Sequence, residues 1–253
     1  MVRTAFLGDA EACRIGFGTV PLARIAEAAA ARANRVHLRT AVTALEWDAT
    51  GRLVGLRTER DGVMQCDAVV LAVPPRTTHR LLGDPVRLGV PGLDRFRHEP
   101  IVDVHLWYDR DDIELDFAAI LDSPVQWVFQ KTPGYFCCSL SAARNFVGHP
   151  SEELVRIGHR ELTSALPALH GARLLRTAVT RDPEATFLPA AGLRRPGPTT
   201  TAPNLTLAGA WTDTGWPATM ESAVRSGRAA ARALRTAAGP ATPTRSKEVP
   251  LAV

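Results

Sequence analysis

The pattern of hydrophobic and polar positions divides the first quarter of the chain into a helix followed by short strands. Apolar side chains recur at helical spacing over residues 21–32, which predicts a helix with one apolar face. Residues 36–47 and 52–58 have β-like content, and Asp61-Gly62 is typical of a tight hairpin turn into a third strand. We therefore expect a small antiparallel β unit after the first helix.

Two continuous apolar runs predict strands of a layered α/β domain. The first spans residues 67–73 and ends at Pro74-Pro75, and the second spans residues 204–209. Runs of this kind are typical of parallel strands that are buried on both faces. A helix is expected to start at Pro217, because proline is favoured in the first helical turn. The predicted buried face of this helix consists of Met220, Ala223, Val224, Gly227, Ala230, Ala231 and Leu234.

The residues between these two runs have a different pattern, which indicates a second domain inserted into the first. The pattern predicts strands at 101–108, 125–130, 135–140 and 173–180. A helix is expected over 151–166, with Ser151 as its N-cap residue and acidic residues in its first turn. Its predicted buried face consists of Leu154, Ile157, Leu162, Ala165 and Leu166. Residues 192–203 are predicted to form a loop rich in Pro, Gly and Thr.

Composition and charge exclude several classes of protein. The chain has 253 residues, of which 45% are hydrophobic and 22% charged, and these fractions exclude intrinsic disorder and collagen-like architecture. No apolar run reaches the length of about 18 residues that a membrane span needs, and the N-terminus does not have the pattern of a signal peptide. The net charge of +4 is spread along the chain and aromatic residues make up 6%, so a nucleic-acid partner is not expected.

The cysteines predict neither a disulfide framework nor a metal site. They are Cys13, Cys66, Cys137 and Cys138, with no CxxC pair and no histidine at zinc-ligand spacing. Cys137 and Cys138 are adjacent in an expected strand, where consecutive side chains point to opposite faces, so they are not expected to pair. This pattern is typical of buried small hydrophobic residues in a reducing cytosol, and we expect a cytoplasmic protein.

The strongest functional signal is residues 205–231, LTLAGAWTDTGWPATMESAVRSGRAAA. This segment predicts a strand, a glycine turn, a loop and a helix whose N-terminus faces the loop. A helix N-terminus offers N–H groups to an anion or to an electron-rich ring edge. The segment resembles the superfamily of FAD-dependent amine oxidases and phytoene desaturases, and most closely its squalene branch, the hydroxysqualene dehydroxylases. Residues 36–75 also resemble strands of the FAD-binding domain of that superfamily.

The resemblance implies FAD as the cofactor and a set of residues that contact it. The backbone at Val42 would meet the adenine, and a glycine at position 209, at the end of a strand, is expected to permit close approach of the cofactor. The helix dipole would stabilise a reduced, anionic flavin. The residues that the resemblance places at FAD are Val42, Gly209, Ala210, Thr219 and Met220.

The resemblance also implies a fold class and a set of domains. The fold class is α/β, with α+β character in the insert: an incomplete Rossmann-like FAD-binding domain with an inserted substrate domain. We assign residues 1–76 to the second part of the FAD-binding domain and 77–186 to the substrate-binding domain. Residues 187–238 would supply the C-terminal FAD-binding strand and helix. The tail at 239–253 is expected to be disordered.

Three departures from the superfamily pattern change the expectation. The dinucleotide fingerprint GxGxxG is absent, because Gly16-Phe17-Gly18 has no apolar strand before it and no third glycine. We therefore expect the C-terminal part of a longer enzyme, one half of a split enzyme with a separate N-terminal nucleotide-binding chain, or a non-catalytic remnant. Ala210 replaces an acidic residue that many relatives use to bind the ribityl hydroxyls. Thr219 replaces an aromatic cage residue of amine oxidases, which argues against amine substrates.

The function implied by the resemblance is reductive dehydroxylation of hydroxysqualene to squalene, with a carotenoid-type desaturase as the enzymatic alternative. An isoprenoid substrate implies peripheral contact with the inner face of the cell membrane. Asp213 is the candidate proton donor near the flavin, and a turn-forming role is the alternative. His79 and His105 are either structural or face a substrate cavity. Three aromatic residues either form core or line an isoprenoid tunnel: Trp107, Trp127 and Phe129.

Overall fold

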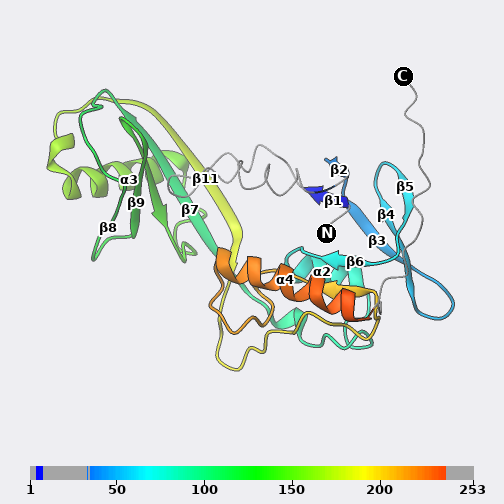
Figure 1. Cartoon of the computed structure of the whole chain (residues 1–253). Helices are drawn as coiled ribbons and strands as arrows, with labels where there is room; N and C mark the ends of the chain where they lie inside the picture. Colours follow the sequence, from blue (N-terminus) through cyan, green and yellow to red (C-terminus); the bar gives the residue numbers. More distant parts are fainter. Residues whose placement is uncertain (1–3, 8–32, 34, 238–253) are drawn as a thin grey trace, which may run out of the picture. The chain divides into compact units, whose positions relative to one another are not determined.

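The computed structural model describes residues 4–7, 33 and 35–237 (Figure 1). The helix expected over 21–32, Cys13, Gly16-Phe17-Gly18 and the tail at 239–253 lie outside the described residues. Two compact units divide the chain: Thr40–Arg95 and Arg194–Val253 form one, and Val2–Arg39 and Phe96–Leu193 form the other. We call the first the discontinuous unit and the second the sheet unit.

The discontinuous unit contains the strands that the sequence predicts in its first and last parts. Strands β3 (Val42–Trp47), β4 (Leu53–Thr58) and β5 (Gly62–Gln65) form an antiparallel sheet, as expected. Strand β6 (Val69–Leu71) pairs in parallel with β12 (Leu205–Leu207), which confirms the parallel pair. The buried side-chain amide of Asn204 donates to the carbonyl oxygens of Leu53 (2.7 Å) and Asp67 (2.8 Å). This amide ties both sheets together, because it bonds the start of β4 and the residues that precede β6.

Burial of the parallel pair differs from the expectation in one strand. All three side chains of β12 are buried, but in β6 only Val69 and Leu71 are buried and Val70 is exposed within the described part of the chain. The short helix α2 (Pro75–Leu82) follows β6. The 3-10 turn η2 (Leu93–Arg95) ends the first segment of the discontinuous unit. Pro75 begins α2 at a position where its missing N–H is not needed.

Helix α4 (Met220–Ala237) begins three residues later than predicted and buries a different face. Thr219 is its N-cap residue, since the Thr219 hydroxyl accepts the N–H of Ser222 (3.3 Å) and the Thr219 carbonyl that of Ala223 (3.0 Å). The buried residues of α4 are Ser222, Ser226 and Ala230. Met220 and Val224, predicted to be buried, are 61% and 50% exposed. The prediction is confirmed at Ala230 and wrong at Met220 and Val224, because apolar periodicity ignores the hydrogen bonds that turn the two serines inward.

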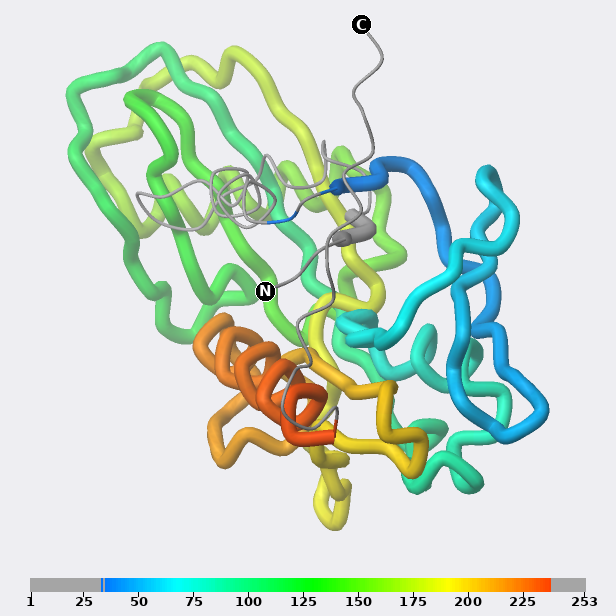
Figure 2. Tube along the Cα trace, turned by 45° about the vertical axis from the view of Figure 1, so that its right-hand side comes forward, coloured from blue at the N-terminus to red at the C-terminus, as the bar shows by residue number. Residues whose placement is uncertain are grey.

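The sheet unit is built on one five-stranded antiparallel sheet in the order β11-β7-β10-β9-β8. The two longest strands, β7 and β11, run side by side over most of their length (Figure 2). The strands are β7 (His98–Tyr108), β8 (Phe117–Ala119), β9 (Trp127–Thr132), β10 (Tyr135–Leu140) and β11 (Leu174–Phe187). β11 continues seven residues beyond the predicted end at 180, past a register shift between Asp182 and Thr186. The shift accommodates Pro183, which has no N–H for the ladder.

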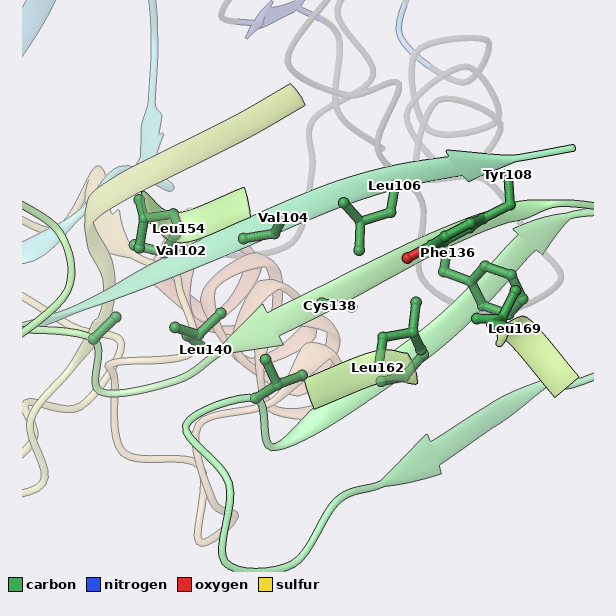
Figure 3. Packing of buried hydrophobic residues seen from close by; sticks show 13 residues of the cluster. Val102, Val104, Leu106, Tyr108, Phe136, Cys138, Leu140, Leu154, Leu162 and Leu169 are labelled. Atoms are coloured by element: carbon green, nitrogen blue, oxygen red, sulfur yellow. The ribbon is translucent and has the colours of Figure 1, made fainter. Parts of the chain in front are cut away.

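Helix α3 (Ser151–Ala165) covers one face of this sheet, and the 3-10 turn η3 (Pro167–Leu169) follows it. Figure 3 shows the core between them, in which Leu154 and Leu162 lie against alternate side chains of β7 and β10. Gly158 permits the close approach of α3 to β7, since a Cβ atom there would lie 2.9 Å from a methyl group of Val104.

Strand β1 (Thr4–Leu7) and strand β2 (Arg35–Leu38) form a parallel pair, so a strand does precede Gly16, contrary to the expectation.

Two further details of α3 differ from the prediction. Its N-cap residue is Pro150, whose extended backbone leads into the helix and whose carbonyl accepts the N–H groups of Glu153 and Leu154. Ser151 is instead the first helical residue, and its hydroxyl accepts an N–H of Arg181. Ala165 is exposed in the last turn, while the predicted Leu154 and Leu162 are buried.

The core of the sheet unit predicts a large stability difference between two leucine positions. Leu162→Ala is expected to lower the free energy of unfolding by about 2–5 kcal/mol, because Leu162 is fully buried and the change leaves a cavity. The control Leu175→Ala removes an exposed side chain of β11 and should change it by less than about 0.5 kcal/mol. Urea unfolding followed by circular dichroism measures both. Equal effects of the two changes would contradict the assignment of this core.

Candidate functional site

The segment from Gly209 to Met220, which joins β12 to the start of α4, contains four of the five residues that the family resemblance places at FAD. One side chain from outside the loop organises it. The Arg195 guanidinium donates from Nε to the Trp211 carbonyl oxygen (3.3 Å) and from Nη1 to that of Trp216 (2.6 Å). Its Nη2 group lies within hydrogen-bond distance of the carbonyl oxygens of Ala210 and Thr212 and of Ser222 Oγ. A planar guanidinium with five N–H groups suits this convergent set of acceptors.

The carbonyl dipoles of the loop therefore point toward Arg195, and the start of α4 is bonded to the same group. Ser222, in the first turn of α4, also forms a hydrogen bond with Thr214 Oγ1 (2.7 Å). The N–H of Asp213 donates to the Pro196 carbonyl oxygen (2.7 Å), which joins the loop to the residue after Arg195. Sequence patterns do not predict this role, because Arg195 stands in a Pro- and Gly-rich segment without periodicity.

Gly209 ends β12 in a conformation that favours glycine, with a φ of 141°. Its N–H donates to Ser226 Oγ (2.8 Å), and its carbonyl accepts both the N–H and the hydroxyl of Thr212. A Cβ atom at position 209 would lie 2.5 Å from Nε1 of Trp211. The indole of Trp211, which donates to the Val73 carbonyl (3.0 Å), occupies the space that this Cβ atom would need. The chain itself therefore requires glycine at position 209, and close approach of a cofactor stays a prediction.

The N-terminus of α4 fits the flavin that the sequence predicts. The Thr219 hydroxyl accepts the N–H of Ser222, which is one of the N–H groups that a helix start leaves unpaired, and the Thr219 carbonyl accepts the N–H of Ala223 in the first regular helical bond. The N–H groups of Met220 and Glu221 have no partner among the described residues. Free N–H groups at the positive end of a helix are suited to the oxygen and nitrogen edge of a flavin ring. The exposed side chains of Met220 and Trp216 flank this position in the sequence.

The structure shows backbone and turn contacts for the remaining expected site residues. Val42 is the first residue of β3 and pairs with Thr58 of β4. Asp213 is exposed, and its carboxylate accepts the N–H of Gly215 (3.1 Å), which is the turn-forming alternative. Ala210 contributes its carbonyl oxygen to Arg195. The exposed His79 lies in α2, where its carbonyl accepts the N–H of Gly83.

The face of the five-stranded sheet opposite α3 is lined with aromatic side chains. We call it the open face, because none of the described helices of the sheet unit packs on it. Trp107 and Tyr135 stack there with ring centroids 4.3 Å apart, and Trp127 and Phe117 are 42% and 61% exposed. Phe129, two residues after Trp127 in β9, stacks on the ring of Trp127, and the amine of Lys131 lies over the ring of Phe129. The three aromatic residues of the tunnel prediction therefore share one surface and do not belong to the buried core.

His105 is a buried polar residue of the open face. It is 3% exposed, and its ring nitrogens lie 2.9 Å from the Tyr135 hydroxyl and 3.2 Å from that of Thr180. Burial lowers the pKa of His105, so the ring is neutral at neutral pH. Burial likewise raises the pKa of Tyr135 and that of Cys137, each to about 12. Cys137 faces the open face while Cys138 lies in the core, which confirms that the two do not face each other.

Other parts of the described chain offer less chemistry. A small apolar cavity of about 210 Å³ lies between β8 and α3, lined by side chains such as Ala118, Val128 and Leu162, and no expected site residue borders it. Within residues 35–237, no three acidic, cysteine or histidine side chains cluster as metal ligands. No helix in the same range is both long and apolar enough to cross a membrane.

The chain matches a family of flavin-containing enzymes and is similar to several known proteins. The family described as flavin containing amine oxidoreductase matches residues 2–235. Hydroxysqualene dehydroxylase of Rhodopseudomonas palustris is 37% identical over 170 residues, which cover 65% of this chain and 38% of that protein. 15-cis-phytoene desaturase of Synechococcus elongatus is 25% identical over 210 residues, or 72% of this chain and 43% of that protein. The chain thus spans less than half the length of these relatives.

A solved structure supports the same fold. The structure of an oxidoreductase from Methanosarcina mazei superposes with a TM-score of 0.63 at 14% identity, and the match covers 84% of this chain and 53% of the other. At this identity the likeness concerns the fold alone. Together with the mixed sheets and helices of the described units, it confirms the predicted α/β class.

The bonds of Arg195 predict that its loss loosens the loop before α4. In Arg195→Ala, the amide hydrogens of Thr212 and Asp213 should exchange at least about tenfold faster, because a hydrogen bond to a charged group contributes about 1.5–3 kcal/mol. The control is Arg194→Ala, which removes the exposed neighbouring arginine and should leave exchange in the loop unchanged. Hydrogen exchange of peptides from this loop is measured by mass spectrometry in the wild-type protein and in both variants. Equal exchange in the two variants would contradict the role of Arg195.

Proposed function

Since the chain belongs to the family of flavin-containing amine oxidoreductases, we propose that it takes part in an FAD-dependent reaction on a long, uncharged isoprenoid alcohol. The reaction is reductive dehydroxylation, in which hydroxysqualene becomes squalene. The observation that carries the proposal is the 37% identity to a hydroxysqualene dehydroxylase, against 25% to a phytoene desaturase. Reduced FAD, when bound, supplies a hydride to the allylic carbon.

The discontinuous unit would hold the flavin. The free N–H groups of Met220 and Glu221 would bind the flavin edge, and the helix dipole would favour its anionic reduced form. Arg195 adds a positive charge next to the loop that precedes this helix start, which acts in the same direction. Gly209, Ala210 and Thr219 contribute by fixing the backbone before α4, and the backbone at Val42 remains the proposed contact of the adenine.

The open face of the sheet unit would bind the isoprenoid chain. Aromatic rings gathered on one face of the sheet, with Phe117 and Trp127 exposed among the described residues, support a ligand surface, because such groups are more often buried. Trp107, Trp127 and Phe129 offer flat apolar area for a polyprenyl chain. Thr219, in place of an aromatic cage residue, gives no support to an amine substrate. An apolar substrate of this size resides in a bilayer, so peripheral contact with a membrane is part of the proposal.

Two further parts of the proposal concern alternatives. A carotenoid-type desaturase reaction is the second candidate, supported by the lower identity to a phytoene desaturase, and in it the flavin would accept the hydride. A separate chain could supply the glycine-rich nucleotide-binding unit, because no GxGxxG sequence occurs in these 253 residues.

The substrate class is tested by offering two substrates to the same protein. The chain is assayed alone and with the N-terminal part of the Rhodopseudomonas palustris relative, anaerobically, with reduced FAD and hydroxysqualene, and squalene is measured by mass spectrometry. A parallel assay in air measures peroxide from spermine. We expect squalene in the first assay and no peroxide in the second. Peroxide without squalene, or silence in both assays, would contradict the proposed substrate.

A further inference from the structure

The cavity of about 210 Å³ between β8 and α3 lies entirely within the sheet unit. Its lining comes from the edge segment at residues 115–121, from Val128 of β9 and from the end of α3. Every lining side chain is leucine, isoleucine, valine or alanine, so we call it the aliphatic cavity. Val128 and Leu162 belong to the core under α3, which places the cavity on the side of the sheet opposite the open face.

The aliphatic cavity extends from the surface of the sheet unit to its core. Leu121 is 84% exposed, and Ala119 and Ala165 are also exposed. At the other end of the lining, Val128 and Leu162 are buried. A ligand can therefore enter from solvent and remove its surface from water against buried aliphatic groups.

Hydrogen bonds hold the outer wall of the cavity at both of its ends. The side-chain amide of Gln130 donates from Nε2 to the Ile113 carbonyl oxygen (2.6 Å), and its Oε1 accepts the N–H of Leu115 (2.6 Å). After the wall, the Ser123 hydroxyl donates to Oε2 of Glu161 in α3 (2.8 Å). The wall is thus tied to β9 at one end and to α3 at the other. These bonds fix its position without placing side chains in the space that it encloses.

Small side chains leave the cavity unfilled. Ala118 of β8 lies opposite Val128 of β9 in the strand register, a position where strands favour larger β-branched or aromatic residues. Ala165 has the same effect at the end of α3. A larger side chain at either position would occupy part of the cavity.

The chemistry of the lining favours hydrocarbon over water. A buried water needs two to four polar partners, and the lining offers no polar side chain. An apolar cavity of about 150 Å³ in another protein stays dry and binds benzene, and on that scale about 210 Å³ has room for about six to eight carbon atoms. None of the lining side chains is aromatic, so ring stacking does not contribute.

We propose that the aliphatic cavity binds a short, uncharged aliphatic hydrocarbon group of up to about eight carbon atoms. Burial of apolar surface drives this binding, without ion pairs or hydrogen bonds from side chains. The proposal goes beyond the proposed function and does not rest on it, because neither the open face nor the start of α4 contributes to the cavity.

The test compares an alkene with its diol on the full chain with ¹³C-labelled methyl groups. The probe is 2-methyl-2-butene, and the control is 2-methylbutane-2,3-diol, which has the same carbon skeleton with two hydroxyl groups. We expect the alkene to shift the methyl resonances of Val128 and Leu162 saturably, with a Kd of about 1 mM or below. The methyl resonances of the exposed Leu175 should not shift. The diol should shift none of them, because its hydroxyl groups would be buried without partners.

Two phenylalanine variants locate the binding site. Ala165→Phe places a ring at the exposed end of the cavity, and the control Ser164→Phe places one at the neighbouring exposed position of α3, which does not line it. Ala165→Phe should weaken binding of the alkene by about tenfold or more, and Ser164→Phe should change it by less than about twofold.

Three results would overturn the proposal: no saturable shift at Val128 and Leu162 up to the solubility limit of the alkene, equal binding of the diol, or equal affinity in the two variants. If Ala165→Phe does not fold, Ala118→Leu fills the cavity from β8 in its place, and unchanged affinity in that variant would overturn the proposal. All of these results are independent of squalene formation, so they leave the proposed function as it stands.

Discussion

The loop before α4 keeps its shape because one guanidinium group collects its backbone carbonyls. Arg195 binds four carbonyl oxygens of residues 210–216 and the hydroxyl of Ser222. Carbonyl groups that converge without such a donor would repel one another and leave polar atoms unpaired. Ser222 and Ser226 then face the loop and Gly209, so the side-chain order of α4 follows from this arrangement and not from its apolar residues. The helix start with its free N–H groups depends on the same set of bonds.

The two faces of the sheet in the sheet unit differ in character, since one is the packed core and the other carries the aromatic side chains. Alternate residues of β7 and β10 pack under α3, where Gly158 allows close contact with Val104 (Figure 3). The intervening residues form the open face, with stacked rings and the hydrogen-bonded His105. Because side chains alternate along a strand, a change on one face leaves the packing on the other largely intact.

Sequence patterns predicted the elements more reliably than the contacts of single side chains. Alternation and turn residues were sufficient for β3 to β5 and for β10, and the family resemblance at residues 205–231 is confirmed by the family match over residues 2–235. The predicted buried face of α4 was right at Ala230 and wrong at Met220 and Val224, since Ser222 and Ser226, which bond to the loop and to Gly209, take the buried positions. Arg195 was missed because its partners lie 15 to 27 residues away in the sequence, and no local pattern encodes such contacts. The domain boundaries at 76 and 186 and the FAD contacts stay predictions.

The start of α4 as the flavin contact is tested most directly by a titration of the ¹⁵N-labelled chain with FAD in the presence of the N-terminal part of the Rhodopseudomonas palustris relative, followed by two-dimensional NMR of the backbone amides. The free N–H groups predict that the largest saturable shifts occur at Met220 and Glu221, with little change at Leu162 in the core under α3. Saturable shifts confined to other parts of the chain, or no shift at Met220 and Glu221 up to millimolar FAD, would contradict the flavin site.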